Sequence, residues 1–341
     1  MADVAALAGV SVATVSRVLN SPSLVQPATR KRIQAAMART SFLRNAIAGS
    51  LAARRSWTVG VVIPTITNPI LAESTRGIAD VLETRGYHLL IGTDDYSSDR
   101  ELELIRTFLE RQVDGLVLTG ITRKPQAERL LRASRRPFVT TWELDRRRGY
   151  ASVSFDNEIA ARSMTETLLR LGHCRIGFVS GLTSTNDRSR ARLRGHRAAL
   201  AAAGTPDDPT LIQEMSFTFE NGRKAMAAFL AMANPPTAVF CVSDLLAVGA
   251  LLECADRGVR VPTDVSIAGF DDLDLASHLR PALTTVRVPT YQMGRLAAEV
   301  LLEMIACGPV RKEELQTEVV IRDSTAPRPS VSTSPAVLPS P

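Results

Sequence analysis

The sequence has few cysteines, few histidines and no long apolar run. Its four cysteines (Cys174, Cys241, Cys254 and Cys307) lie far apart without a CxxC pair, and its four histidines lack metal-ligand spacing. This pattern excludes a disulfide framework and a structural zinc site, and it predicts a reducing, cytoplasmic location. Because a membrane span needs about 18 or more apolar residues in a row, and the N-terminus lacks the order of a signal peptide, we expect no membrane association.

Signatures of common enzyme sites are also absent. No GxGxxG follows an expected strand, and neither GxxxxGK[ST] nor GxSxG occurs, which argues against dinucleotide, P-loop and hydrolase chemistry. Asp271 and Asp272 could form a carboxylate pair, but neighbours at a strand end point to opposite faces. We therefore expect no catalytic activity, no cofactor and no bound metal.

Positive charge is concentrated at the N-terminus. Residues 1–60 hold eight Arg and Lys against one acid, Asp3, whereas the whole chain has a formal net charge of +6. A small basic head on a nearly neutral body indicates a polyanion partner, because neutralising phosphates supplies most non-specific affinity for nucleic acids. A solvated, arginine-rich surface is the alternative.

The first forty residues predict three short helices. In DVAALAGVSVATVSRVLN the apolar residues form two helical stripes, with Gly9 between them at a position suited to positive φ and Ser11 as the cap of the second helix. A third helix is expected from about Thr29 to Arg39. This order is typical of a helix-turn-helix, whose second helix would read base edges. A plain helical hairpin is the alternative.

From Trp57 onward, apolar strands alternate with helices. Alternation of this kind predicts a doubly wound α/β architecture in two units, about 57–155 and 156–285, with ligands bound at the carboxyl ends of the strands. The expected strands are 59–64, 88–93, 115–119, 138–141, 151–155, 175–180, 237–242 and 265–270. The expected helices are 72–85, 98–111, 125–134, 157–171, 190–203, 220–232, 245–257 and 289–306.

DVAALAGVSVATVSRVLN, VGVVIPTITNP, LGHCRIGFVSG, TAVFCVSDLLAVGAL and VPTDVSIAGFDD, in this order, resemble the lactose-repressor (LacI/GalR) family of bacterial transcription regulators. The similarity runs from about residue 2 to 325, and SFDNEIAARSM is similar to gluconate-type repressors. The resemblance implies a ligand-responsive, sequence-specific DNA-binding repressor of carbohydrate or sugar-acid genes. A two-lobed sugar-binding protein or an α/β enzyme without a regulatory role is the alternative.

The resemblance also implies how the chain is divided. It places a helix-turn-helix domain at 1–44, a hinge helix at 45–56, and a two-lobed ligand-binding and dimerisation domain of periplasmic-binding-protein type at 57–325. Lobe 1 would hold residues 57–155 and 286–317, and lobe 2 residues 156–285 and 318–325. The Pro- and Ser-rich tail, 326–341, should be disordered. No leucine-heptad helix ends the chain, so a homodimer reading a near-palindromic operator is expected.

Carried over residue by residue, the family's DNA contacts fall on both the second helix and the hinge. Arg17 can pair with guanine, whereas Val12 and Ala13 offer apolar contact to base edges. Leu51 matches the leucine that wedges into the minor groove. The full set of expected DNA contacts is Val12, Ala13, Thr14, Ser16, Arg17, Asn20, Asn45 and Leu51.

The family's effector positions map to the ends of the expected strands. Arg192 and Asp271 would bind hydroxyls or a carboxylate from opposite sides, and Phe217 would stack on an apolar face. Trp142 stands where the family often has an Asp, a role Glu143 could take. The full set is Ile70, Leu71, Trp142, Arg192, Phe217, Ser243, Asp244 and Asp271.

Two features of this set bear on the chemical class of the effector. Ile70 and Leu71 are aliphatic where purine-binding members of the family that the chain resembles stack aromatic side chains, which argues against a nucleobase. Arg188 and Arg190 beside Arg192 would suit an anionic ligand such as a sugar acid, unless they face solvent. Interlobe salt bridges or core packing are the alternatives for these positions.

Overall fold

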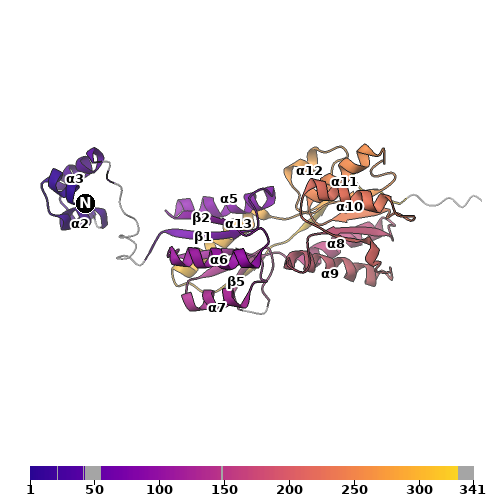
Figure 1. Cartoon of the computed structure of the whole chain (residues 1–341), viewed down its shortest axis with the longest axis horizontal. Helices are drawn as coiled ribbons and strands as arrows, with labels where there is room; N and C mark the ends of the chain where they lie inside the picture. The colour runs from indigo at the N-terminus through magenta and orange to yellow at the C-terminus, as the bar shows by residue number, and fades with distance from the viewer. Residues whose placement is uncertain (21, 41, 43–54, 147–148, 329–341) are drawn as a thin grey trace, which may run out of the picture. The chain divides into compact units, whose positions relative to one another are not determined.

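The computed structural model describes residues 1–328 except 21, 41, 43–54 and 147–148. By its contacts the chain forms two compact units that divide between Trp57 and Thr58. Figure 1 labels several elements of each unit. The hinge helix expected at 45–56 lies almost wholly outside the described residues, as do Asn45 and Leu51.

The first unit is built from three α-helices around one small apolar core. These helices are α1 (Ala2–Ala8), α2 (Val12–Asn20) and α3 (Pro27–Arg39), with a 3₁₀ turn at Pro22–Leu24. Gly9 ends α1 at φ 63°, a conformation that disfavours a Cβ, and Thr14 N donates to Ser11 Oγ at 3.2 Å, so Ser11 caps α2. The buried core consists of Val4, Ala5, Ala8, Val15, Val18, Val25, Ile33 and Ala36.

Lobe 1 contains a six-stranded parallel sheet in the order β11-β5-β4-β3-β1-β2. Its strands are β1 (Thr58–Ile63), β2 (His88–Thr93), β3 (Gly115–Thr119), β4 (Phe138–Thr141), β5 (Ala151–Ser154) and β11 (Lys312–Glu314). Its helices are α5 (Pro69–Thr84), α6 (Ser98–Glu110), α7 (Pro125–Ser134) and α13 (Thr290–Ile305). The helix α13 packs on α5 and on strands β3 to β5, so the chain returns to lobe 1 after leaving it.

Lobe 2 contains a four-stranded parallel sheet in the order β7-β6-β8-β9. Its strands are β6 (Ile176–Ser180), β7 (Ile212–Glu214), β8 (Ala238–Cys241) and β9 (Ser266–Ala268). Its helices are α8 (Asn157–Arg170), α9 (Asp187–Ala202), α10 (Phe219–Leu230), α11 (Asp244–Asp256) and α12 (Asp274–His278), with a 3₁₀ turn at Pro209–Leu211. An antiparallel pair, β10 (Thr285–Arg287) with β12 (Glu318–Val320), lies beside it, because Ile267 N donates to Ser324 O.

All eight expected strands and all eight expected helices of the body are present, with ends that differ by a few residues. The helix α9 begins at Asp187 instead of the expected residue 190, because the Asn186 side chain accepts from Arg188 N and Ser189 N and so caps the helix earlier. The three-residue strands β7, β10 and β11 were not expected, because runs this short have no readable period.

The expected disordered tail begins too early. Ala326 N donates to Ser266 Oγ at 3.1 Å, and Ala326 O accepts from His173 Nε2 at 3.0 Å. Arg328 N donates to Leu171 O at 2.8 Å. Disorder is therefore wrong for residues 326–328, while 329–341 lie outside the described residues.

Aromatic rings connect the apolar cores of the two lobes. Trp142 at the end of β4 meets Phe155 edge-on with ring centres 6.4 Å apart, and Phe155 meets Phe270 of lobe 2 at 6.1 Å. All three are nearly fully buried.

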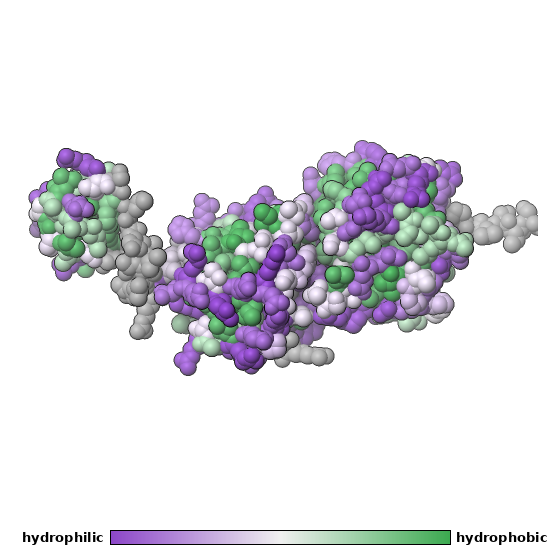
Figure 2. All heavy atoms as spheres, in the orientation of Figure 1, coloured by the Kyte–Doolittle hydropathy of each residue, from purple (hydrophilic) through white to green (hydrophobic). Residues whose placement is uncertain are grey.

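Polar and apolar residues are interspersed over the face shown in Figure 2. Among the described residues no single helix is long and apolar enough to cross a membrane; α1 and α2 pass that test only as a pair, bent by 101°.

Candidate functional site

The second helix of the first unit divides cleanly into a buried and an exposed face. Val15 and Val18 are buried in the three-helix core, whereas Val12, Ala13 and Arg17 are exposed. A helix of 3.6 residues per turn separates positions 12, 13 and 17 from 15 and 18 in this way. The three expected base-reading side chains therefore share one solvent-facing surface.

The other expected DNA contacts in α2, Thr14 and Ser16, are less exposed to solvent. Thr14 and Ser16 are half-buried, and Thr14 Oγ1 lies 2.9 Å from Ser11 Oγ. Asn20 is the last residue of α2. Arg17 is thus one cation among small side chains on the exposed face of α2. Such a face can enter the major groove of DNA, where the arginine can donate to a guanine.

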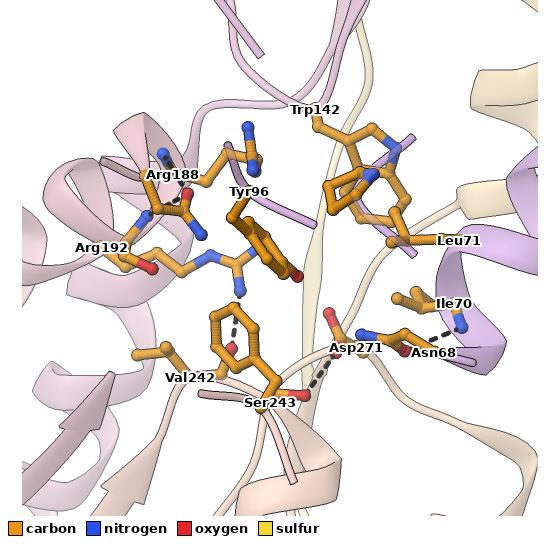
Figure 3. A pocket seen from close by; sticks show the side chains of 14 residues that line it. Asn68, Ile70, Leu71, Tyr96, Trp142, Arg188, Arg192, Val242, Ser243 and Asp271 are labelled. Carbon is orange, nitrogen blue, oxygen red and sulfur yellow. Dashed lines mark hydrogen bonds between the residues drawn. The ribbon is translucent and has the colours of Figure 1, made fainter. Parts of the chain in front are cut away.

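The second candidate site is a cleft lined by residues from both lobes. Seven of the eight expected effector residues line this cleft, and Asp244 is the exception. Figure 3 shows Arg192 and Tyr96 on one side and Ile70, Leu71 and Trp142 on the other, with Asp271 between them. The full lining is Pro64, Asn68, Ile70, Leu71, Tyr96, Trp142, Asn186, Arg188, Ser189, Arg192, Phe217, Val242, Ser243 and Asp271.

Arg192 is buried, lines the cleft and is held by three contacts within the protein. Its Nε donates to Asn157 Oδ1 at 2.8 Å, its Nη1 donates to Val242 O at 2.7 Å, and its guanidinium lies 3.7 Å from the centre of the Phe270 ring. Burial lowers the pKa of Arg192 to about 10, partly offset by the charge of Asp271. The group stays a cation near neutral pH, with part of its donor fork left for a ligand.

Asp271 follows β9 and is also buried. Ser243 Oγ donates to Asp271 Oδ2 at 3.1 Å. Burial raises the pKa of Asp271 to about 7, against the opposing effects of Arg192 and the Ser243 hydroxyl. Since an ionised carboxylate accepts hydrogen bonds at both oxygens, Asp271 can accept from ligand hydroxyls.

Asp244 does not line the cleft, contrary to expectation. Its Oδ1 accepts from Thr285 Oγ1 at 2.6 Å, and its Oδ2 accepts from Leu273 N at 2.8 Å. Burial raises its pKa well above the ordinary value. Both oxygens are used inside the protein, so Asp244 ties the start of α11 to the segments that follow β9.

The basic triplet expected around Arg192 splits into three different roles. Arg190 donates to Thr183 O at 2.7 Å and to Thr122 Oγ1 at 3.1 Å, and it is not part of the cleft lining. Arg188 does line the cleft, and its Nη1 pairs with Asp187 Oδ1 at 2.8 Å. The positive charge of Arg188 is therefore balanced inside the protein.

Asp187 joins the two lobes. Its Oδ2 accepts from the backbone N–H groups of Ile121 at 2.6 Å and Thr122 at 2.7 Å, which belong to the loop after β3 in lobe 1. Burial works against ionisation, but Arg188 and these donors hold its pKa below the ordinary value. We call this set of bonds the Asp187 interlobe contact.

Glu143, considered as a substitute for the family's Asp, points to a protein partner. Its Oε2 accepts from Asn157 Nδ2 at 2.9 Å, and it is not part of the cleft lining. Burial, followed by the charge of Asp187, raises its pKa to about 8.

Tyr96 is the main cleft residue that the sequence did not reveal. Its ring lies 5.9 Å from that of Phe217, and burial raises its pKa to about 12, so the phenol remains a neutral donor. Tyr96 sits three residues after β2, a position at a carboxyl strand end that could have indicated it. In the described part of the chain no cluster of three or more His, Cys, Asp or Glu could hold a metal.

Comparisons with known proteins agree over nearly the whole chain. The family model of bacterial regulatory proteins, lacI family, matches residues 1–45, and the model of the periplasmic binding protein-like domain matches residues 165–325. The chain is 36% identical to the HTH-type transcriptional repressor CytR of Escherichia coli (strain K12) over 331 residues, 96% of this chain and 97% of that one.

Two solved structures are also similar. The transcription regulator GntR from Chromobacterium violaceum superposes with a TM-score of 0.74 and 35% identity, covering 79% of this chain and 99% of that one. The transcriptional regulator CelR in complex with cellobiose superposes with a TM-score of 0.70 and 33% identity, covering 94% and 98%.

Proposed function

Because this chain belongs to the lacI family of bacterial regulatory proteins, and is thus a ligand-responsive, sequence-specific DNA-binding regulator, we propose which residues carry its two functions. Val12, Ala13 and Arg17 read the operator, and Arg192 and Asp271 bind the effector. The observation that supports the effector site best is that seven residues implied by the family resemblance, from distant parts of the chain, line one cleft. The chain acts as a homodimer in the cytoplasm and catalyses no reaction.

The effector we propose is a neutral, hydroxyl-rich carbohydrate. Arg188 is paired with Asp187, and Arg192 faces Asp271, so the two cations of the cleft are matched by two carboxylates. Arg190, which supported a sugar acid on the sequence alone, is engaged outside the cleft lining. A sugar acid would bring an unbalanced negative charge, whereas hydroxyls can pair with both signs.

Effector and DNA binding are coupled through the lobes. A ligand that binds the closed cleft more tightly than the open cleft shifts the lobes toward closure. The ratio of closed to open protein can change by no more than the ratio of the two affinities. We propose that this movement alters the pairing of the two hinge segments, including Asn45 and Leu51, on the operator. A wedge of Leu51 between base steps would make this step sensitive to hinge geometry.

The test has a DNA arm and a ligand arm. Electrophoretic shifts on an operator selected from a random library should show that Arg17→Ala lowers specific affinity by about 5- to 150-fold, since one bidentate contact to a base contributes about 1–3 kcal/mol. Arg39→Ala, which removes the same charge from α3, is the matched control and should weaken specific and non-specific binding alike. Equal effects of both variants would refute the role of Arg17.

The ligand arm compares the thermal stability of the full chain with glucose, ribose, cellobiose and gluconate. A neutral sugar should raise Tm and change operator affinity, and Asp271→Asn should remove both effects. Stabilisation by gluconate alone would refute the neutral effector and restore the sugar acid.

A further inference from the structure

The cleft residue Asp271 and its neighbour Asp272 both have backbone angles that residues other than glycine rarely adopt. Asp271 has φ 118° and Asp272 has φ 56°. Such conformations cost free energy and persist only where the surrounding structure holds them. We call residues 271–273 the effector turn, because Asp271 lines the cleft from this segment. Contacts with other parts of the chain must therefore fix the effector turn.

Side-chain packing fixes the effector turn on only part of its surface, because the turn lies between two spaces. Asp271 and Ile70 line the cleft, and both also line a groove of about 790 Å³. Asp272 and Leu273 belong to the lining of the same groove. Atoms that line a space have no packing partners on that side. Hydrogen bonds and ion pairs thus contribute much of what holds the turn in place.

The carboxylate of Asp272 makes two of these ion pairs. Its Oδ2 accepts from Arg287 Nε and its Oδ1 accepts from Arg322 Nη2, both at 2.7 Å. The side chain of Asp272 is 10% exposed and that of Arg322 is 17% exposed. Hydrogen bonds between ionised groups are stronger than neutral ones, and partial burial strengthens them further. Arg322 is itself held in place, since its Nη1 donates to Leu283 O at 2.7 Å.

Both arginines belong to segments that connect the two lobes. Arg287 ends β10, which leads from lobe 2 to α13 of lobe 1, and Arg322 follows β12, through which the chain returns to lobe 2. The strands β10 and β12 pair with each other, and Arg287 Nη1 donates to Glu318 Oε2 at 2.9 Å. We call β10 and residues 318–322 the crossing strands. A rotation of one lobe against the other must bend or twist them, because the chain passes between the lobes through them.

A backbone hydrogen bond also joins the effector turn to β10. Asp271 N donates to Val286 O at 2.9 Å, directly before the arginine that pairs with Asp272. The carboxylate of Asp271 lines the cleft, while its N–H group and the next side chain hold the crossing strands. A ligand that binds the Asp271 carboxylate therefore acts on a turn that is bonded to the segments between the lobes.

We propose that Asp272 is a positioning residue that transmits effector binding to the orientation of the lobes. Its carboxylate holds the effector turn to both crossing strands, so a bond between the effector and Asp271 favours one arrangement of these strands. Asp272 is not part of the cleft lining and acts through Asp271. This inference rests on the proposed function, because it concerns the regulation of the same effector site.

Asp272→Asn tests this role in the full chain, with glucose, ribose, cellobiose and gluconate as probes. The variant keeps the size of the side chain but removes its charge and one of its two acceptor oxygens. Ser243 and Val286 still hold Asp271, so isothermal titration should show nearly unchanged affinity for any probe that binds the wild-type chain. Electrophoretic shifts should show that the effect of this probe on operator affinity, typically about 5- to 150-fold for coupled sites, falls below about twofold. A purely structural role would not separate probe binding from the operator response.

A second measurement needs no probe. Cys307 follows α13 of lobe 1 and Cys174 precedes β6 of lobe 2, and both are exposed, whereas Cys241 and Cys254 are buried. Spin labels on the two exposed cysteines report the distance between the lobes by double electron–electron resonance, with labelled chain diluted into unlabelled chain. Asp272→Asn should make the distribution of this distance about twofold broader, because the crossing strands lose their ion pairs with the effector turn.

Two further variants separate this role from the fold. Asp274→Asn removes the same charge from a side chain that is fully exposed, and it should leave both the operator response and the lobe distances unchanged. Arg287→Gln breaks the pair with β10 from its half-exposed partner, and should weaken the operator response even if Asp272→Asn does not fold. Combined with Asp272→Asn it should add little, because both changes break the same pair.

The outcomes distinguish the role of Asp272 from the effector site itself. An operator response that persists in Asp272→Asn, or equal losses in Asp272→Asn and Asp274→Asn, would overturn the role of Asp272 and leave the effector site standing. If none of the four probes binds the wild-type chain, the proposed effector class is overturned, and the spin-label distances decide the role of Asp272. A broader distribution then supports this role, and an unchanged width overturns it.

Discussion

Removing the carboxylate of Asp187 should loosen the contact between the lobes without unfolding either one. Asp187 lies in the first turn of α9 in lobe 2. The two N–H groups that donate to its carboxylate, those of Ile121 and Thr122, lie in lobe 1. In Asp187→Ala these two donors lose their acceptor in the closed state. Opening of the cleft then exposes them to water, so the closed state is the one that becomes less stable.

The magnitude follows from the bonds that cross the cleft. A hydrogen bond to a charged group contributes about 1.5–3 kcal/mol net. Two such bonds lead from one buried carboxylate, but Arg190 still donates to Thr122 Oγ1 across the same gap. We therefore expect closure to lose about 1.5–3 kcal/mol in all, which is about 10- to 150-fold in the opening equilibrium.

Amide hydrogen exchange measures this opening directly and needs no ligand. Exchange at Ile121 and Thr122 should accelerate by about 10- to 150-fold in Asp187→Ala, because local opening sets the rate. Asp208→Ala is the matched control: it removes a side chain that accepts from Thr210 N within lobe 2 and should leave these amides unchanged. Unchanged protection in Asp187→Ala, or equal acceleration in both variants, would refute the Asp187 interlobe contact.

Three further outcomes are expected. Burial raises the pKa of Asp271 from 3.8 to about 7, so between these pH values the folded state holds a proton that the unfolded state has lost, and the protein loses stability as pH rises. Asp271→Asn should therefore flatten the plot of Tm against pH between about pH 4 and 7, and should raise Tm most above pH 7. An unchanged plot would contradict this. Leu51→Ala should weaken specific operator binding far more than non-specific binding, since only a kinked site accepts the wedge; equal losses would assign Leu51 to the linker alone. Gly120→Ala should disturb the Asp187 interlobe contact, because Gly120 has φ +76° and an added Cβ would lie 2.3 Å from Arg188 Nη1. Amide hydrogen exchange at Ile121 should then become faster. An unchanged exchange rate would show that Arg188 moves aside freely.

The fold could be predicted closely because its signals are local. Buried parallel strands appear as continuous apolar runs, and the helices between them carry their own periodic stripes. The caps are read less easily: Asn68 caps α5, so this helix begins at Pro69 instead of the expected residue 72. The short strands β7, β10 and β11 escaped because three residues contain no period, and their pairing depends on neighbours far away in sequence.

The cleft residues were expected from the family resemblance more than from spacing. Arg192, Phe217, Ser243 and Asp271 were implied as the family's effector positions, and all four line the cleft. Ser243 and Asp271 follow β8 and β9, and the carboxyl ends of parallel strands meet at one edge of a sheet. Asp244 lies outside the cleft lining because its carboxylate accepts from Thr285 and Leu273, whereas its neighbour Ser243 lines the cleft, and sequence spacing alone does not separate the two.

The sequence by itself determined the order of strands and helices, the basic head and the exposed face of α2, because each is written in the spacing of nearby residues. Only the tertiary structure decided which partners Arg190 and Arg192 meet. Both lie on α9 with Arg188, which pairs with its own sequence neighbour Asp187, whereas Thr122 and Val242, which accept from Arg190 and Arg192, are 68 and 50 residues away in the chain. The strength of a charge or hydrogen bond depends on distance and burial, and folding alone brings these groups together.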